Sequence, residues 1–102
     1  MIDYQGQPYE QVIGRQGVVV VQYFATWCGP CKMLKPVLEA LSTEMTDVAF
    51  FRSDIDLYRN QAIEAGIRSV PTVVVYKDGE EVDRQSGYQP KERVAAWLNQ
   101  YR

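Results

Sequence analysis

The 102-residue sequence contains no histidine, which excludes several kinds of active site. Serine–histidine–aspartate triads, cysteine–histidine nucleophile pairs and HExxH zinc sites all need an imidazole. Only two cysteines are present, too few for the disulfide framework of a small secreted domain. A zinc ion would have to be held by these two cysteines and carboxylates, a poor ligand set. We therefore expect no metal site.

An excess of positive charge and long apolar segments are also missing. Eleven Lys and Arg face thirteen Asp and Glu, a net charge of −2, whereas a sequence-independent nucleic-acid binder needs a basic surface. The longest apolar run, residues 18–21, is far too short to cross a membrane. The N-terminus has no basic segment followed by an apolar stretch, as a secretory signal would. These absences predict a cytoplasmic protein that binds neither nucleic acid nor membrane.

The residues that are present fit an ordinary globular domain. Hydrophobic residues make up 46% and charged residues 24% of the chain, and we find no repeat, low-complexity tract or linker. A chain of this length has room for one hydrophobic core. We therefore expect a single domain over residues 1–102.

Alternating types of hydrophobic periodicity predict an α/β fold. The β-branched and aromatic run at 18–24 is typical of a strand buried on both faces, and further strands are expected at 2–4, 48–52, 72–76 and 81–85. Helices are expected at 9–15, 30–44, 57–65 and from Pro90 onwards. This order predicts a mixed central β-sheet of about five strands flanked on both faces by about four helices.

Local patterns add three expectations. Pro36 should kink the 30–44 helix, because its ring removes one amide donor. Apolar residues at helical spacing should face the core: Met33, Leu34, Val37, Leu38, Leu41 and Met45 in that helix, and Val94, Trp97, Leu98 and Tyr101 in the last. The acidic residues Asp78, Glu80, Glu81 and Asp83, in and after a tight turn at 77–80, should be solvated.

The feature that carries chemistry is Cys28-Gly29-Pro30-Cys31, placed where the 18–24 strand gives way to the 30–44 helix. A cysteine at a helix N-terminus lies beside unpaired amide donors and the positive end of the helix dipole, which favour the thiolate. Cys31 follows one turn later, within reach of the first sulfur. The pair can therefore close a small disulfide. Half of a zinc site is the alternative, but no second CxxC or histidine exists to complete it.

With these residues identified, the sequence resembles the thioredoxin family over essentially its whole length. The matching motifs are ATWCGPCK at 25–32, IRSVPT at 67–72 and KDGE at 77–80, together with Gly87 and the proline at position 36. The Gly-Pro pair between the cysteines is typical of thioredoxins and differs from the dipeptides of isomerases and glutaredoxins. The resemblance implies the thioredoxin fold.

The resemblance also implies a protein-disulfide reductase and assigns roles to matching residues. Cys28 would attack a substrate disulfide, and Cys31 would resolve the mixed disulfide that forms. A docking surface around Cys28 would consist of Trp27, Gly29, Pro30, Val70, Gly87 and the cis-proline Pro71. No cofactor would be bound, and electrons would come from NADPH through a thioredoxin reductase. The partners would be that reductase and disulfide-containing proteins. Independently of the resemblance, a monomer is our default expectation.

One position departs from the family. Gln22 stands where relatives usually have a buried aspartate, which can accept the proton of the resolving cysteine. Because an amide does not titrate, our hypothesis is that Cys31 is deprotonated less efficiently here. Arg52 occupies a position where the family commonly has lysine, and with Lys32 it completes the supporting residues.

Two alternatives differ in function. A thioredoxin-like binding module would recruit a partner and use redox turnover only secondarily; Gln22 favours this alternative, and the two retained cysteines argue against it. An oxidant or isomerase would differ in reduction potential, and by resemblance the Gly-Pro pair argues against that class.

Overall fold

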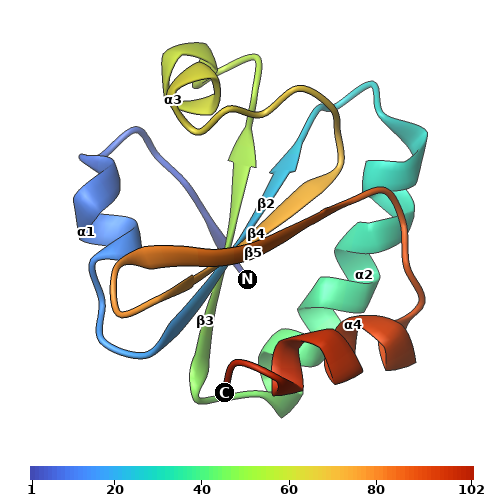
Figure 1. Ribbon diagram of the computed structural model, residues 1–102. Coiled ribbons are helices and arrows are strands. Elements are labelled where there is room, and N and C mark those ends of the chain that lie inside the picture. Colours follow the sequence, from blue (N-terminus) through green and yellow to red (C-terminus); the bar gives the residue numbers. More distant parts are fainter.

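A five-stranded mixed sheet forms the centre of the computed structural model, which describes residues 1–102 (Figure 1). The strand order is β1-β3-β2-β4-β5. β3 pairs in parallel with β1 and β2, whereas β4 is antiparallel to β2 and β5 is antiparallel to β4. The strands are β1 (Ile2–Asp3), β2 (Val18–Phe24), β3 (Val48–Asp54), β4 (Thr72–Lys77) and β5 (Glu80–Ser86). The expected mixed sheet is confirmed.

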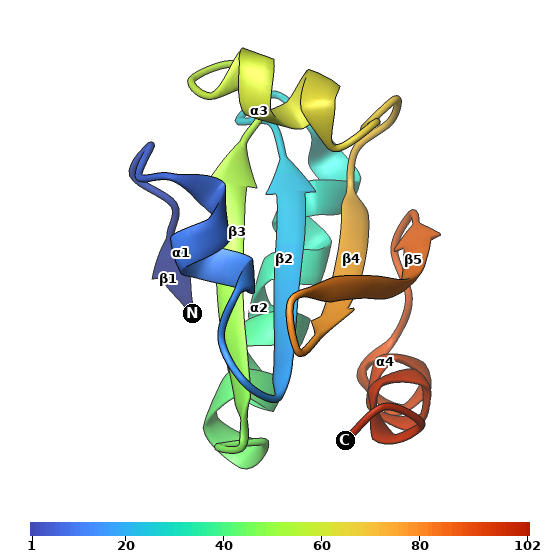
Figure 2. The ribbon, with the colours of Figure 1, turned by 60° about the vertical axis from the view of Figure 1, so that its left-hand side comes forward.

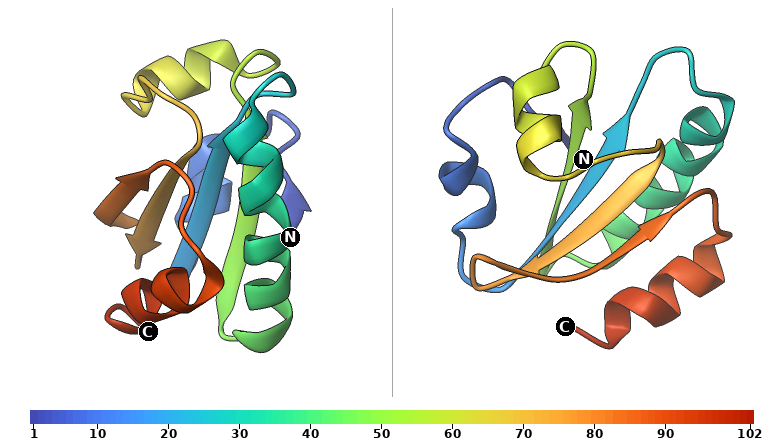
Figure 3. Two further views of the ribbon diagram at one scale, coloured as in Figure 1. Left: turned by 90° about the vertical axis from the view of Figure 1, so that its right-hand side faces the viewer. Right: turned by 45° about the horizontal axis from the view of Figure 1, so that its top comes forward.

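Four helices cover the two faces of this sheet. They are α1 (Tyr9–Ile13), α2 (Gly29–Glu44), α3 (Arg59–Glu64) and α4 (Lys91–Asn99). α2 and α4 pack on one face, and α1 and α3 contribute to the core of the other (Figure 2). α4 lies beside the C-terminal half of α2, where Lys91 pairs with Glu44 (Figure 3). No helix combines the length and the apolar character needed to cross a bilayer.

Side-chain alternation along β2 explains this two-sided arrangement. Val18 and Val20 belong to the core under α2 and α4, while Val19 and Val21 belong to the opposite core, as the two-residue period of a strand requires. Burial of an aliphatic side chain contributes roughly 1.5–3 kcal/mol. β2 therefore contributes side chains to the hydrophobic cores on both faces of the sheet.

The core face of α2 is narrower than expected. Leu34, Leu38 and Leu41 are buried, but Met33 is 58% exposed. The expectation that Met33 packs in the core was wrong. The face of α2 that packs on the sheet follows an i, i+4, i+7 series of residues, and Met33 lies outside that series. Pro36 lies inside α2, which continues through it to Glu44.

Several element boundaries differ from the sequence prediction. β3 runs two residues further, to Asp54, and α3 begins only at Arg59. The reason is a turn in which the Asp54 carboxylate accepts the backbone N–H groups of Asp56 and Leu57 at 2.9 and 3.3 Å. Aspartate commonly stabilises turns in this way. Pro90 is the N-cap of α4 and precedes its first turn.

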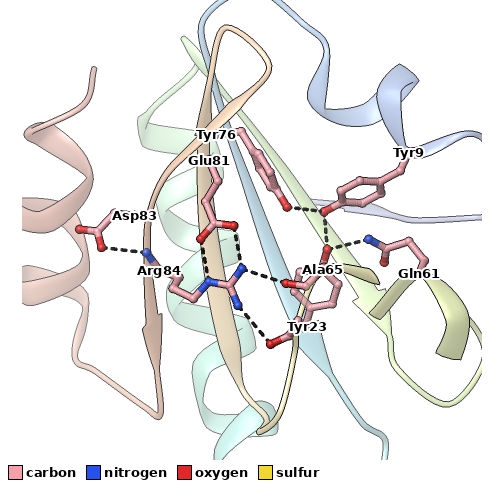
Figure 4. Close-up of polar contacts among 9 residues, drawn as sticks. Tyr9, Tyr23, Gln61, Ala65, Tyr76, Glu81, Asp83 and Arg84 are labelled. Atoms are coloured by element: carbon pink, nitrogen blue, oxygen red, sulfur yellow. Dashed lines mark hydrogen bonds and ion pairs between the residues drawn. The ribbon is translucent and has the colours of Figure 1, made fainter. Parts of the chain in front are cut away.

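On the α1/α3 face, a network of tyrosine hydroxyls closes the core (Figure 4). The Tyr9 hydroxyl is bonded to that of Tyr23 and, at 3.1 Å, to that of Tyr76. The Gln61 amide of α3 donates to Tyr23 at 2.8 Å. Burial raises the pKa of Tyr9, Tyr23 and Tyr76 above the ordinary value, so all three hydroxyls remain neutral hydrogen-bonding groups at physiological pH.

We expected the acidic residues of the β4–β5 hairpin to be solvated; this holds for Glu80, which is exposed, whereas Asp78, Glu81 and Asp83 make specific contacts. Asp83 accepts hydrogen bonds from the Trp97 indole at 2.7 Å and from the Tyr101 hydroxyl at 2.6 Å. These two bonds lower the pKa of the Asp83 carboxyl. Glu81 pairs with Arg84 at 2.7 Å, and Asp78 accepts the Gly17 N–H at 2.8 Å. The hairpin therefore uses its charges to fix α4 and the neighbouring loops.

We expect the Asp83 contacts to make stability depend on pH. Because the folded-state pKa is lowered, the contribution is complete above the ordinary carboxyl pKa of about 3.9 and is lost as the pH falls through the folded-state value. Asp83→Asn should lower the free energy of unfolding by about 1 kcal/mol near neutral pH, since hydrogen bonds to a charged acceptor are weakened. Urea unfolding at neutral and strongly acidic pH measures the difference, which should shrink in acid.

The matched control is Asp47→Asn. Asp47 pairs with Arg102 at the surface, and exposed pairs contribute little to stability because water and salt screen them. The loss for Asp47→Asn should therefore be clearly smaller. Equal losses for the two variants, or a loss for Asp83→Asn that does not change with pH, would contradict the assignment.

Candidate active site

The two cysteines lie at the carboxyl edge of the parallel strands, where β2 leads into α2. Cys28 is the N-cap residue of α2, with an extended backbone (φ −89°, ψ 112°), and its Sγ accepts the Cys31 N–H at 3.2 Å. The Cα atoms of Cys28 and Cys31 are 5.3 Å apart and the sulfurs form a disulfide. The Cys28 sulfur is therefore directed at the N-terminal amides of α2, the position that favours a thiolate.

Both cysteines are nearly covered. Cys28 is 5% and Cys31 3% exposed, and they form a small buried cluster with Ala25. Phe24, Ile55 and Val70 pack against this cluster. A reaction partner therefore has to approach along the surface that surrounds the disulfide.

The residues before and after Cys28 leave that surface open. Trp27 is 68% exposed, and its indole N–H donates to Asp56 at 3.0 Å, which fixes the ring beside the cysteines. Gly29 and Pro30 are exposed. A Cβ added to Gly29 would meet no atom within 4 Å, so the open face begins directly next to Cys28.

A second segment, distant in the sequence, lies on the other side of the disulfide. The Val70–Pro71 peptide bond is cis, and Val70 packs against the cysteine cluster. The Gly87 N–H donates to the Pro71 carbonyl at 2.9 Å. Gly87 has φ +90°, a conformation that favours glycine, and a Cβ there would meet nothing within 4 Å. The structure thus brings together all six residues assigned to the docking surface from the sequence.

Behind Cys31 lie the residues named as supporting. Gln22 is fully buried; its amide nitrogen donates weakly to the Cys31 carbonyl, at 3.4 Å, and its Oε1 has no partner. Gln22 is the register partner of Arg52 in β3. The Arg52 guanidinium lies 3.8 Å from the centre of the Phe24 ring, and Lys32 lines the same cavity as Arg52 and Cys31.

Sequence reasoning missed the contribution of the β3–α3 connection. Asp56 holds the Trp27 indole, and Ile55 packs against the cysteine cluster. Their signal was present: acidic residues follow a strand that is parallel to the one before the cysteines, and the carboxyl ends of parallel strands share one edge. The chain has no cluster of three or more carboxylate or cysteine side chains arranged for a metal ion.

Comparison with known proteins decides which family has this geometry. The family model described as Thioredoxin matches residues 1–100. The chain belongs to the thioredoxin family. The thioredoxin of Chlamydia muridarum is 44% identical over 85 residues, 83% of each chain, and that of Staphylococcus haemolyticus is 43% identical over 88 residues, 85% of each.

Solved thioredoxin structures have the same fold. A mutant thioredoxin from Halobacterium salinarum NRC-1 superposes with a TM-score of 0.89 at 38% identity, covering 98% of this chain and 88% of that one. The thioredoxin NaTrxh of Nicotiana alata also gives 0.89, at 33% identity, covering 99% and 91%. The resemblance and the thioredoxin fold are therefore confirmed, and the protein is a thiol–disulfide oxidoreductase with a Cys28–Cys31 pair.

The unpaired Gln22 oxygen leads to a stability prediction. A buried polar atom without a partner is unfavourable by about 1–3 kcal/mol, and methionine fills a similar volume without polar N or O atoms. We expect Gln22→Met to raise the free energy of unfolding by about 1 kcal/mol in denaturant titrations.

Gln61→Met is the matched control, because Gln61 also has an unpaired buried Oε1 but donates a 2.8 Å bond to Tyr23. This variant should be destabilised. A clear loss of stability in Gln22→Met as well would contradict our account of Gln22.

Proposed function

We propose that this thioredoxin family member is a general reductant of protein disulfides, acting as one domain over residues 1–102. The observation that carries the proposal is the position of Cys28, whose sulfur caps the N-terminus of α2 beneath an open surface. There the helix amides favour the thiolate that attack requires.

The reaction takes place in two exchanges. The Cys28 thiolate attacks one sulfur of the substrate disulfide, and the other substrate sulfur leaves as a thiolate. The Cys31 thiolate then attacks Cys28 Sγ, so that the Cys28–substrate bond breaks and the Cys28–Cys31 bond forms. The substrate disulfide gains two electrons and the dithiol loses two. Cys31 lies one helical turn from Cys28 and needs no large movement to react.

We assign roles to the residues of the docking surface around Cys28. Trp27, Gly29 and Pro30 form one side and Val70, Pro71 and Gly87 the other. Val70 would offer its backbone groups to an extended segment of the substrate, and the exposed Trp27 ring would cover apolar side chains.

The spent disulfide would be reduced by an NADPH-dependent thioredoxin reductase. Thioredoxins need no bound cofactor, so electrons would arrive through a second dithiol exchange at the same surface. Such a reductant acts where dithiols are kept reduced, which fits a cytoplasmic protein. We propose that the chain is a monomer, since the surface that docks substrates must be free.

Substitution of the cysteines tests the reductase function. With NADPH and a thioredoxin reductase, the wild type should reduce insulin, and Cys28→Ser should lower turnover to the uncatalysed background because the attacking thiolate is gone. Cys31→Ser should retain the attack and accumulate the mixed disulfide, seen by mass spectrometry as a covalent adduct.

Turnover by Cys28→Ser would refute the assigned nucleophile. An inactive wild type with an intact fold and a titratable dithiol would favour the binding module, whose partner binding would survive Cys28→Ser.

Gln22 gives a second test. We infer that resolution is slower here than with a carboxylate at this position, because the amide cannot accept the Cys31 proton. In Gln22→Asp, burial should raise the carboxyl pKa, and resolution should accelerate as the pH rises through that pKa, by roughly 10-fold or more. Stopped-flow measurement of the resolving step from about pH 6 to 9 tests this.

Gln22→Asn is the matched control, since it also shortens the side chain but does not titrate. If Gln22→Asp matched the wild-type rate across the whole range, a proton-accepting role for this position would be excluded.

A further inference from the structure

A cavity of about 590 Å³ lies directly beside the resolving cysteine. It opens between the N-terminal half of α2 and the carboxyl ends of β2 and β3, which end side by side in Figure 2. Its charged lining residues are Lys32 and Lys35 from α2, Arg52 and Asp54 from β3, and Asp3 from β1. Cys31 and Phe24 complete the wall nearest the disulfide.

Strand register places Asp54 on the same side of the sheet as Gln22. Gln22 pairs with Arg52 and Phe24 pairs with Asp54 across the parallel β2–β3 ladder, and register partners in a sheet point to the same face. Gln22 reaches α2 through the Cys31 carbonyl. Asp54 therefore belongs to the α2 face, two residues nearer the active-site edge than Arg52.

The resolving step needs a proton acceptor at this place. Cys31 must become a thiolate before it attacks, yet it is 3% exposed, Gln22 does not titrate and the chain has no histidine. Only two carboxylates line the cavity. Asp3 is paired with Arg52 at 3.6 Å, whereas Asp54 uses Oδ1 for two backbone N–H groups and leaves Oδ2 without a partner in the chain.

We propose that Asp54 accepts the proton of Cys31 through water in this cavity. This step rests on the proposed reductase function and specifies its second half. The Cys31 thiol gives its proton to a water molecule, which passes a proton to the Asp54 carboxylate. The Cys31 thiolate attacks Cys28 Sγ, the substrate sulfur leaves as a thiolate, and Asp54 then releases its proton to solvent.

The cavity has room for water, and charged residues are part of its lining. Water occupies about 30 Å³ per molecule in the liquid and stays in a protein cavity when polar partners are present. Arg52 and Lys32 line the same space. Their positive charges favour the Cys31 thiolate once the proton has left.

Asp54→Asn tests the route, because asparagine retains the Oδ1 acceptor of the turn but loses the titratable carboxyl and its negative charge. A disulfide dye, 5,5′-dithiobis(2-nitrobenzoate), releases one thiolate on attack by Cys28 and a second on resolution by Cys31. The second phase is independent of dye concentration and reports resolution alone. Asp54→Asn should slow it by roughly 10-fold at neutral pH and leave the first phase within about twofold.

The direction of the change separates proton transfer from charge. If Asp54 acted only through its negative charge, which disfavours a nearby thiolate, Asp54→Asn would speed resolution. A faster or unchanged second phase would therefore overturn the proposal. Asp3→Asn, which removes the other carboxylate of the cavity and frees Arg52 from its ion pair, should not slow the second phase; an equal slowing would also overturn the proposal.

Two rescues distinguish a missing base from a disturbed structure. Imidazole, added as a small base, should accelerate the second phase more in Asp54→Asn than in the wild type. Gln22→Asp combined with Asp54→Asn should restore the rate by supplying a second carboxylate beside Cys31. Failure of both rescues would assign the loss to structure and overturn the proposal. The assay needs neither protein substrate nor reductase, so its outcome is separate from that of insulin reduction.

Discussion

The parallel pairing of β2 with β3 is the constraint on which the active site depends. Because Phe24 and Asp54 are register partners, β2 and β3 end at the same edge of the sheet. After β2 the chain forms the turn that contains the two cysteines and then α2. After β3 it forms the turn held by the Asp54 carboxylate, which places Asp56 within hydrogen-bond distance of the Trp27 indole. A shift of one residue would turn every side chain of β3 to the opposite face. It would remove Arg52 and Asp54 from the cavity beside Cys31.

This edge tolerates polar groups that the rest of the sheet does not. Further down β2, Val18 and Val20 pack into a continuous apolar core, where an unpaired amide oxygen would only destabilise the fold. Gln22 carries such an oxygen, but it lies next to Cys31 and Arg52. The polar residues thus replace part of the core directly behind the disulfide. Polar residues at this position therefore contribute less packing energy to the fold than apolar residues would.

The sequence was sufficient for features that depend on neighbours in the chain. The buried strand at 18–24, the helix after the cysteines and the CxxC motif at their junction all follow from local periodicity and helix-end chemistry. Asp83 was not predictable in this way, since its partners Trp97 and Tyr101 lie 14 and 18 residues further on. The late start of α3 was missed because the side chain of Asp54 competes with the helix for the backbone N–H groups. Met33 was assigned to the core because an apolar residue next to a helical stripe has no local sign of exposure.

Cys28 and Cys31 lie one helical turn apart, but we propose that they lose their protons by different routes. Cys28 lies at the N-cap, against the amides of α2 and next to the open surface at Gly29, so the proposed path of its proton leads toward that surface. Cys31 lies one turn deeper, with its polar surroundings on the side of Gln22 and Arg52. In our proposal a proton from Cys31 therefore crosses the cavity between α2 and the sheet. In the mechanism we propose, residues of the docking surface govern the first exchange and residues of β3 govern the second, so that the two steps can be tuned independently within one fold.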